Sequence, residues 1–217
     1  CRFTIELHRA NGFATDDWYH VPWGVDYRLF PARLKAPGKE RVVVGFAGTL
    51  LGHKGAHVLV EAVAKRPDLD VELRLWGESF HEDNYGRRLR ELAGDDPRIS
   101  FRGRYSHDEF SDLLSGLDAL AIPSLWHENL PTTGLNAVAA GVPLLVSDVG
   151  GLAELVSDYA CGFTFPTGNP DALADLLLEL SHDRRRLEAV RASIVDPPPL
   201  EEEAWRVEQI YRCAVRR

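Results

Sequence analysis

The feature of this sequence that most limits its fold is a repeated switch between two spacings of apolar residues. Short apolar runs predict strands over residues 42–47, 99–101, 119–122, 143–146 and 162–165, and an alternation of apolar and charged residues predicts one more over 71–76. Apolar residues at helical spacing predict helices over residues 57–65, 82–92, 107–114, 132–140, 152–156, 170–180 and 184–192. The first run is apolar throughout, which is typical of a strand buried on both faces. Strands that alternate with helices in this way predict an α/β fold with one parallel sheet and helices on both of its faces.

The two ends of the chain depart from this pattern. The first forty residues hold one short amphipathic stretch and a polar linker around residues 37–39. At the other end, three consecutive prolines at 197–199 interrupt the chain before a last helix, predicted over residues 201–215. We therefore divide the chain into a leading helix and linker at 1–40, a sheet domain at 41–196 and a terminal helix at 197–217.

The composition narrows the class of partner. The chain has 217 residues, of which 45% are hydrophobic and 27% charged, as expected for one globular domain with an ample core. Its formal net charge of −8 argues against nucleic acid and anionic lipid as partners, although a local basic pocket could still bind a phosphate group. No apolar run reaches the roughly 18 residues that a transmembrane helix requires.

The cysteines and histidines predict neither disulfides nor a metal site. Cys1, Cys161 and Cys213 form an odd, widely spaced set without metal or redox spacing, which favours a reduced, cytoplasmic setting. The eight histidines are scattered, and a loop–helix boundary separates His53 from His57. We therefore expect no metal and no cofactor.

In a sheet of this kind ligands bind where the strands end, so the segments that follow the strands are the candidate binding loops. The first strand is followed by residues 48–55, in which glycines and Lys54 come immediately before a helix. Glycine permits close approach of the backbone, helix-start N–H groups attract anions, and lysine supplies charge. These are the ingredients of a phosphate site. The segment is neither a P-loop nor a GxGxxG motif, so an ordinary turn with a solvated lysine is the alternative.

The loop after the strand at 119–122 carries more information. Glu128 precedes Thr132 and Thr133, which could cap the next helix, and Asn136 lies within the first two turns of that helix. Exposed N–H groups at the helix start would suit a diphosphate, and Glu128 and Asn136 could bond sugar hydroxyls. The alternative is a loop whose glutamate is solvated and whose asparagine makes a local backbone bond.

Residues 123–151 closely resemble the donor-site signature of the retaining glycosyltransferases of the GT-B fold in family 4, glycosyl transferases group 1. That signature reads proline-serine, a glutamate, seven residues, glutamate-alanine, a small-residue stretch and glycine-x-proline. The corresponding positions here are Pro123-Ser124, Glu128, Asn136-Ala137, 139–143 and then 147–151. The likeness also includes residues 22–26, 48–55, 101–103 and 151–154, so ordered matches cover most of the chain.

The resemblance implies a Rossmann-like, nucleotide-sugar-binding domain at 41–196, the C-terminal half of a two-domain GT-B enzyme. It implies that Lys54 pairs with the donor diphosphate and that Glu128 contacts the sugar, and these two form the expected catalytic set. The backbone of 130–134 would hold the distal phosphate and sugar, position 136 the ribose, and Arg104 and Tyr105 the base. The full donor-binding set is Gly48, Thr49, Lys54, Arg104, Tyr105, Glu128, Asn129, Leu130, Pro131, Thr132, Thr133, Gly134 and Asn136.

The same resemblance implies partners for this domain. A second domain would precede Cys1, the helix within 197–217 would dock on it, and an acceptor saccharide, lipid or small molecule would bind between the two. The fragment alone is then expected to bind donor weakly and to transfer nothing. Enzymes of this group generally need no metal, which agrees with the scattered histidines.

Two positions depart from the family pattern. Asn136 stands where the family has its second glutamate, and an amide offers one carbonyl acceptor and no charge, so we expect weaker donor binding. Thr49 stands where the family often has an arginine. Two alternatives therefore stay open: a degenerate, non-catalytic binding domain, and a sugar-nucleotide epimerase of related fold.

Overall fold

A computed structural model describes residues 1–30, 32–38, 40–79 and 84–215. Its centre is a six-stranded parallel sheet with the strand order β3-β2-β1-β4-β5-β6. The strands are β1 (Val42–Ala47), β2 (Val71–Trp76), β3 (Ile99–Gly103), β4 (Ala119–Ile122), β5 (Leu144–Ser147) and β6 (Gly162–Phe165). Strand β1 lies between β2 and β4, and all six of its residues are buried, as its continuous apolar run predicts.

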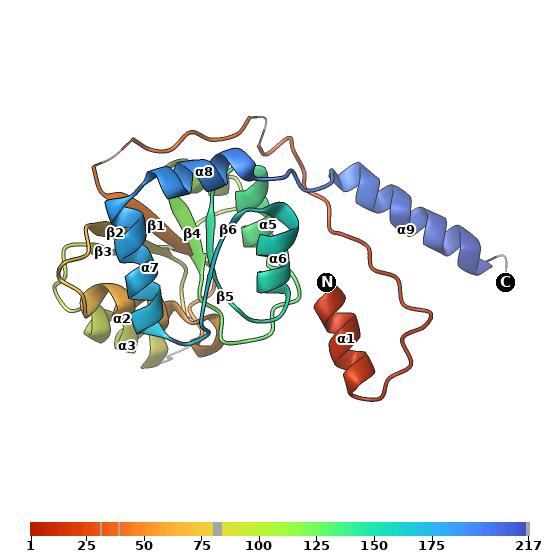
Figure 1. Ribbon diagram of the computed structural model, residues 1–217, viewed down its shortest axis with the longest axis horizontal. Coiled ribbons are helices and arrows are strands. Elements are labelled where there is room, and N and C mark those ends of the chain that lie inside the picture. Colours follow the sequence, from red (N-terminus) through yellow and green to blue (C-terminus); the bar gives the residue numbers. More distant parts are fainter. Residues whose placement is uncertain (31, 39, 80–83, 216–217) are drawn as a thin grey trace.

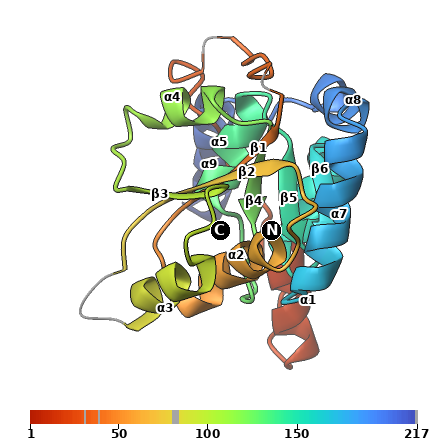
Figure 2. The same ribbon diagram turned by 90° about the vertical axis from the view of Figure 1, so that its left-hand side faces the viewer.

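Helices cover both faces of the sheet (Figures 1 and 2). One face packs against α2 (Ala56–Ala64), α3 (Asn84–Ala93) and α7 (Pro170–His182), and the other against α4 (Phe110–Ser115), α5 (Thr132–Ala139) and α6 (Gly151–Tyr159). Each face has its own core: Leu59, Leu73 and Leu173 belong to the first, and Leu120 and Leu135 to the second. Helix α8 (Arg185–Ser193) follows α7 and lies across one end of the sheet (Figure 1). The predicted α/β fold with helices on both faces is confirmed.

Two predicted helices differ from the observed ones by three residues at one end. The helix expected at 107–114 begins only at Phe110, because residues 107–109 form a turn instead, in which the Phe110 amide donates to His107 O (3.2 Å), three residues back. The helix expected at 152–156 is longer, from Gly151 to Tyr159. The helix expected at 82–92 is observed as Asn84–Ala93, and its first two expected residues lie outside the described residues, as does Lys39 of the expected linker.

The chain enters and leaves the sheet domain at one place. Val25 forms a parallel bridge with Pro199, with the Val25 amide donating to Pro198 O (2.9 Å) and the Leu200 amide to Val25 O (3.0 Å). Gly24 permits this approach, because a Cβ there would lie 2.5 Å from the Cα of Leu200. We call this contact the clasp.

Two helices lie outside the sheet domain. Helix α1 (Arg2–Ala10) contacts α6, whereas α9 (Leu200–Val215) projects from the body and contains no buried residue (Figure 1). Among the described residues, none of the helices combines the length and the apolar character needed to cross a membrane.

Candidate functional site

Lys54 and Glu128 meet where the strand order changes direction, between β1 and β4. Lys54 ends the short 3-10 helix η1 (Gly52–Lys54) after β1, and Glu128 lies on the loop after β4. Lys54 Nζ lies 2.5 Å from Glu128 Oε1, and the two side chains are 34% and 14% exposed. The sequence predicted both residues, and the fold brings them together at the carboxyl edge of the sheet, where open α/β sheets bind ligands.

A close approach of two backbones sets the position of this pair. Gly55 has φ +72°, and a Cβ there would lie 1.8 Å from the carbonyl oxygen of Pro123. The Leu125 amide donates to His53 O over 2.8 Å, which joins the same two loops. Only glycine fits at position 55 without moving the two loops. Gly55 therefore helps to set the distance between Lys54 and Glu128.

Ser124 orients the Glu128 carboxylate. Its side chain is fully buried, and its hydroxyl lies 3.1 Å from both Glu128 Oε1 and His53 O. The Gly151 amide also donates to Glu128 O over 2.9 Å. Ser124 was noted in the sequence only as part of the proline-serine motif. The available signal was its position directly after a strand and four residues before the carboxylate.

The start of helix α5 opens toward the same place. Pro131 occupies the N-cap position, and no side chain there accepts a hydrogen bond. The prediction that Thr132 and Thr133 cap this helix is wrong, because both lie inside it as its first two residues. The N–H groups of the first turn therefore have no capping side chain, and they carry the positive end of the helix dipole.

These parts line one cleft of about 320 Å³. It brings together eight of the residues expected from the sequence: Gly48, Thr49, Lys54, Glu128, Leu130, Pro131, Thr132 and Thr133. Trp23 also lines it, from the segment that leads into the domain. Lys54 is the one cation among the described residues that line this cleft. A cation, a half-buried carboxylate and an uncapped helix start can together hold a phosphate group next to a hydroxylated one.

A second hollow, of about 220 Å³, adjoins the cleft and shares Gly48 and Thr49 with it. The expected base-facing residues Arg104 and Tyr105 line it, together with Gly77 and Glu78. Glu78 was not predicted, because it follows a strand whose next loop residues carry no recognisable motif.

Three residues of the predicted donor-binding set line neither the Lys54 cleft nor the second hollow. Asn129 Oδ1 accepts hydrogen bonds from the Cys1 ammonium group (2.7 Å) and from Thr4 (3.1 Å), so its side chain points toward α1. Gly134 is buried against Ile122. Asn136 is half-buried on α5 and lines neither hollow.

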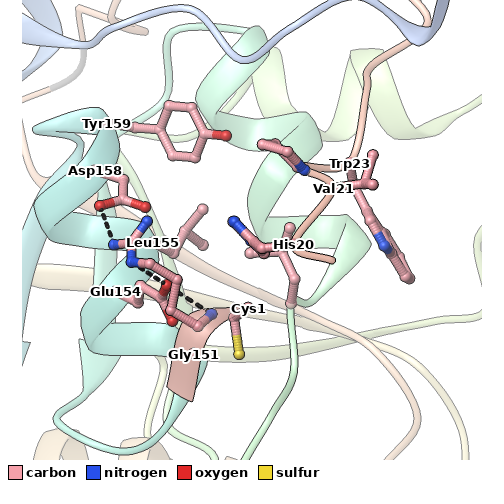
Figure 3. Close-up of a pocket in the computed structure, with 12 residues that line it drawn as sticks. Cys1, His20, Val21, Trp23, Gly151, Glu154, Leu155, Asp158 and Tyr159 are labelled. Atoms are coloured by element: carbon pink, nitrogen blue, oxygen red, sulfur yellow. Dashed lines mark hydrogen bonds and ion pairs between the residues drawn. The ribbon is translucent and has the colours of Figure 1, made fainter. Parts of the chain in front are cut away.

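A third hollow, of about 150 Å³, lies between α1, the segment at residues 20–23 and α6. Figure 3 shows Glu154 and Asp158 on one side and His20 and Trp23 on the other. Trp23 also lines the Lys54 cleft, so the two spaces share a wall. Burial lowers the pKa of His20, which favours its neutral form at neutral pH.

Glu154 holds helix α1 in place beside this hollow. Its two carboxylate oxygens accept the backbone amides of Arg2 (2.9 Å) and Phe3 (3.1 Å), and Arg2 Nε lies 3.0 Å from Oε1. The carboxylate thus caps the start of α1 from a different helix. The sequence showed Glu154 only as part of a glycine-x-x-glutamate motif, since nothing local reveals a partner 152 residues away.

No group of three metal-binding side chains occurs within the described parts of the chain. His127, a neighbour of Glu128, stacks on Phe3 with ring centroids 5.0 Å apart and does not line the cleft.

Residues 30–194 match the family model for glycosyl transferases group 1. A GDP-mannose-dependent monoacylated alpha-(1-6)-phosphatidylinositol monomannoside mannosyltransferase of Corynebacterium glutamicum is 31% identical over 213 residues, covering 88% of this chain and 54% of that protein. A D-inositol 3-phosphate glycosyltransferase of Stackebrandtia nassauensis is 29% identical over 210 residues, covering 88% of this chain and 46% of that protein. This chain therefore spans about half the length of these relatives.

Solved structures share the fold. Anabaena HepE, in complex with UDP, matches with a TM-score of 0.70 and 22% identity over 88% of this chain and 56% of that one. The C-terminal domain of a glycosyl transferase group 1 family protein from Francisella tularensis matches with a TM-score of 0.67 and 20% identity, over 78% of this chain and 94% of that one.

Proposed function

The chain belongs to the glycosyl transferases group 1 family, and on that basis we propose that it binds the nucleoside-diphosphate sugar donor of a retaining glycosyltransferase. The observation that carries the proposal is the Lys54–Glu128 pair, which faces the uncapped start of α5 across one cleft. The donor diphosphate would lie between Lys54 and the first N–H groups of α5, and the sugar next to Glu128.

In the proposed transfer reaction, negative charge develops on the diphosphate as it leaves the sugar. The bond between the anomeric carbon and the diphosphate oxygen breaks, and the diphosphate leaves with the electron pair. The acceptor hydroxyl oxygen bonds to the anomeric carbon on the same face, and its proton passes to the departing diphosphate. Lys54 and the α5 N–H groups are placed to stabilise the leaving group, which is electrostatic catalysis. Glu128 would accept hydrogen bonds from sugar hydroxyls and hold the ring in position. We propose that the reaction needs no metal.

The complete protein is part of the proposal. The relatives named above act with different acceptors, and one is named for GDP-mannose while a structural neighbour holds UDP. We propose a preceding domain that supplies the acceptor wall, on which the exposed aromatic side chains of α9, Trp205 and Tyr211, would dock. The three unpaired cysteines support a cytoplasmic setting within the same proposal.

The test is calorimetric titration of the chain with UDP, GDP and ADP and with their sugar conjugates. We expect one or more of these nucleotides to bind, and Lys54→Ala to weaken binding about 10- to 100-fold through loss of a charge-assisted contact. Lys65→Ala is the matched control, because Lys65 forms an exposed pair with Glu61 on α2, away from the cleft; it should change binding less than about two-fold.

Glu128→Gln separates the sugar from the diphosphate. Because Glu128 neutralises Lys54 in the free protein, its loss should leave binding of the plain nucleoside diphosphate unchanged or tighter. The additional affinity contributed by the sugar should fall. The proposal is wrong if no nucleotide binds, or if Lys54→Ala and Lys65→Ala behave alike.

A non-catalytic binding domain is the second candidate. Its support is that Thr49 lines the cleft where the family often has arginine, so that Lys54 is the one cation among the described lining residues. Donor binding by a longer form of the protein, without transfer to any acceptor, would favour this candidate.

A further inference from the structure

We infer that Glu78 and Arg104 select a guanine base, an inference that rests on the proposed donor site. The hollow they line shares Gly48 and Thr49 with the Lys54 cleft, so a ligand whose diphosphate reaches Lys54 continues directly into it. In the sheet order, the loops that form this hollow follow β1, β2 and β3, whereas Glu128 follows β4 on the other side of Lys54. Base and sugar therefore extend in opposite directions from the diphosphate.

The backbone of this hollow is a fixed frame. The Gly48 amide donates to Trp76 O (3.1 Å), and the Leu50 amide to Glu78 O (3.1 Å), which ties the first two loops together. The Gly77 amide donates to Gly103 O (2.8 Å), which adds the third loop. Gly77 has φ +140°, and a Cβ there would lie 1.9 Å from Gly48 O. The backbone that carries Glu78 is thus held before a ligand arrives, which limits the entropy lost on binding.

The two charged side chains on this frame are available to a ligand. Arg104 Nε lies 3.3 Å from Glu78 Oε2, and the side chains are 71% and 53% exposed. An ion pair this exposed contributes little stability, so opening it for a ligand costs little. The ring of Tyr105, which also lines the hollow, stacks on Phe110 with centroids 5.6 Å apart.

Among the common bases, guanine fits this pair of charges best. Its N1–H and its exocyclic amino group are adjacent donors that can both bond one carboxylate, and its O6 and N7 accept from a guanidinium group. Uracil presents one N–H between two carbonyl oxygens, so a carboxylate that accepts the N–H also faces a like-charged oxygen. Adenine offers its amino group beside an unprotonated ring nitrogen, which again meets the carboxylate with an acceptor. The pair therefore favours GDP over UDP and ADP.

Calorimetric titration of the chain with GDP, UDP and ADP tests this selection. We expect GDP to bind at least about ten-fold more tightly than UDP, and Glu78→Gln to remove most of that preference by weakening GDP alone. Glu91→Gln is the control, since it removes the same charge from an exposed position on α3 and should leave all three affinities unchanged. Circular dichroism of each variant checks that the fold is intact.

Lys54→Ala distinguishes the inference from the proposed function. If both hold, Lys54→Ala weakens the binding of GDP, UDP and ADP by a similar factor, whereas Glu78→Gln weakens the binding of GDP alone. Lys54-dependent binding without a preference for GDP, or a preference that survives Glu78→Gln, overturns the inference and leaves the donor site standing. Failure of all three nucleotides to bind overturns both.

Discussion

Arg98 and Asp96 form a largely enclosed ion pair in the loop before β3, next to the end of α2. Arg98 Nη2 lies 2.6 Å from Asp96 Oδ2, and the side chains are 12% and 15% exposed. The same guanidinium donates to the carbonyl oxygens of Val63, Arg66 and Leu69, at 2.7, 2.7 and 3.0 Å, where α2 ends. It thereby binds one carbonyl group in the last turn of α2 and two in the loop that follows the helix.

Asp96→Asn should lower the free energy of unfolding by about 2 kcal/mol at pH 7, because the guanidinium loses its charged partner. Asp68→Asn is the control, since its pair with Arg66 is 55% exposed on the carboxylate side and its loss should cost clearly less stability than the loss of the Asp96 pair. Urea denaturation measures both. Equal losses of unfolding free energy in the two variants would mean that burial does not strengthen the Asp96–Arg98 pair.

The stability lost in Asp96→Asn should depend on pH in a defined way. The hydrogen bond from Arg98 holds the pKa of Asp96 below its ordinary value in the folded protein. Its stabilisation is therefore complete above the unfolded pKa, about 3.9, and is lost as the pH falls through the lower, folded pKa. The stability difference between wild type and Asp96→Asn should be constant from pH 7 to about 5 and shrink below about pH 4. A difference that grows in acid would contradict this assignment.

Single functional residues could be predicted from the sequence where a charged side chain stands on a loop directly after a strand. Lys54 and Glu128 were predicted because a charge on a loop after a strand is conspicuous. Ser124 and Glu78 were not, since their roles depend on the distance between separate loops. Ser124 bonds a carbonyl 71 positions earlier, and no pattern in either segment reveals that contact.

Among the elements, α5 and α7 begin in opposite ways. Asn169 caps α7, accepting from the amides of Asp171 (3.1 Å) and Ala172 (3.0 Å), with Pro170 as the first helical residue. Helix α5 begins after Pro131 without a side-chain cap. The first N–H groups of α7 are therefore capped by a neighbouring side chain, whereas those of α5 have no side-chain cap and can bind a ligand.

This difference predicts unequal effects on stability. Asn169→Ala should lower the free energy of unfolding by about 1 kcal/mol. Thr132→Ala, at the start of α5, should change it by less than about 0.5 kcal/mol, because no cap is lost there. Thermal and urea denaturation of the ligand-free chain give both values. A loss at Thr132 as large as that at Asn169 would show that α5 is capped after all.

The elements themselves were largely predictable. The strands at 42–47, 71–76, 119–122 and 162–165 have the expected bounds. The first and third are buried throughout and have continuous apolar runs, whereas the second alternates between buried and half-buried residues. The start of α4 differs from the prediction because residues 107–109 form a turn before it, which the apolar spacing of 107–114 does not reveal. The docking of α1 was missed because Glu154, on another helix, holds it.

For the whole molecule, the proposed function assigns this chain one wall of the donor cleft and the proposed preceding domain the other. Helix α9 buries none of its residues, and Trp205 and Tyr211 are 60% and 68% exposed, as expected for a surface that another part of the protein covers. The 217-residue chain should bind donor but transfer no sugar to an acceptor. Incubation with radiolabelled donor and a panel of saccharide and lipid acceptors tests this, with a longer form of the protein as the positive control. Transfer by the short chain at an enzymatic rate would contradict it.

The clasp between Val25 and Pro199 also decides how the domain responds to force. Tension applied through the segments before Gly24 and after Leu200 runs along two parallel backbones in opposite directions, and it loads the two clasp hydrogen bonds in shear. The six strands lie outside that line of load, between the two attachment points along the chain. Under tension the clasp is therefore the first contact to break, and it is the one place about which the flanking segments turn. It can open and close again while the sheet, and the cleft at the edge of the sheet, stay intact.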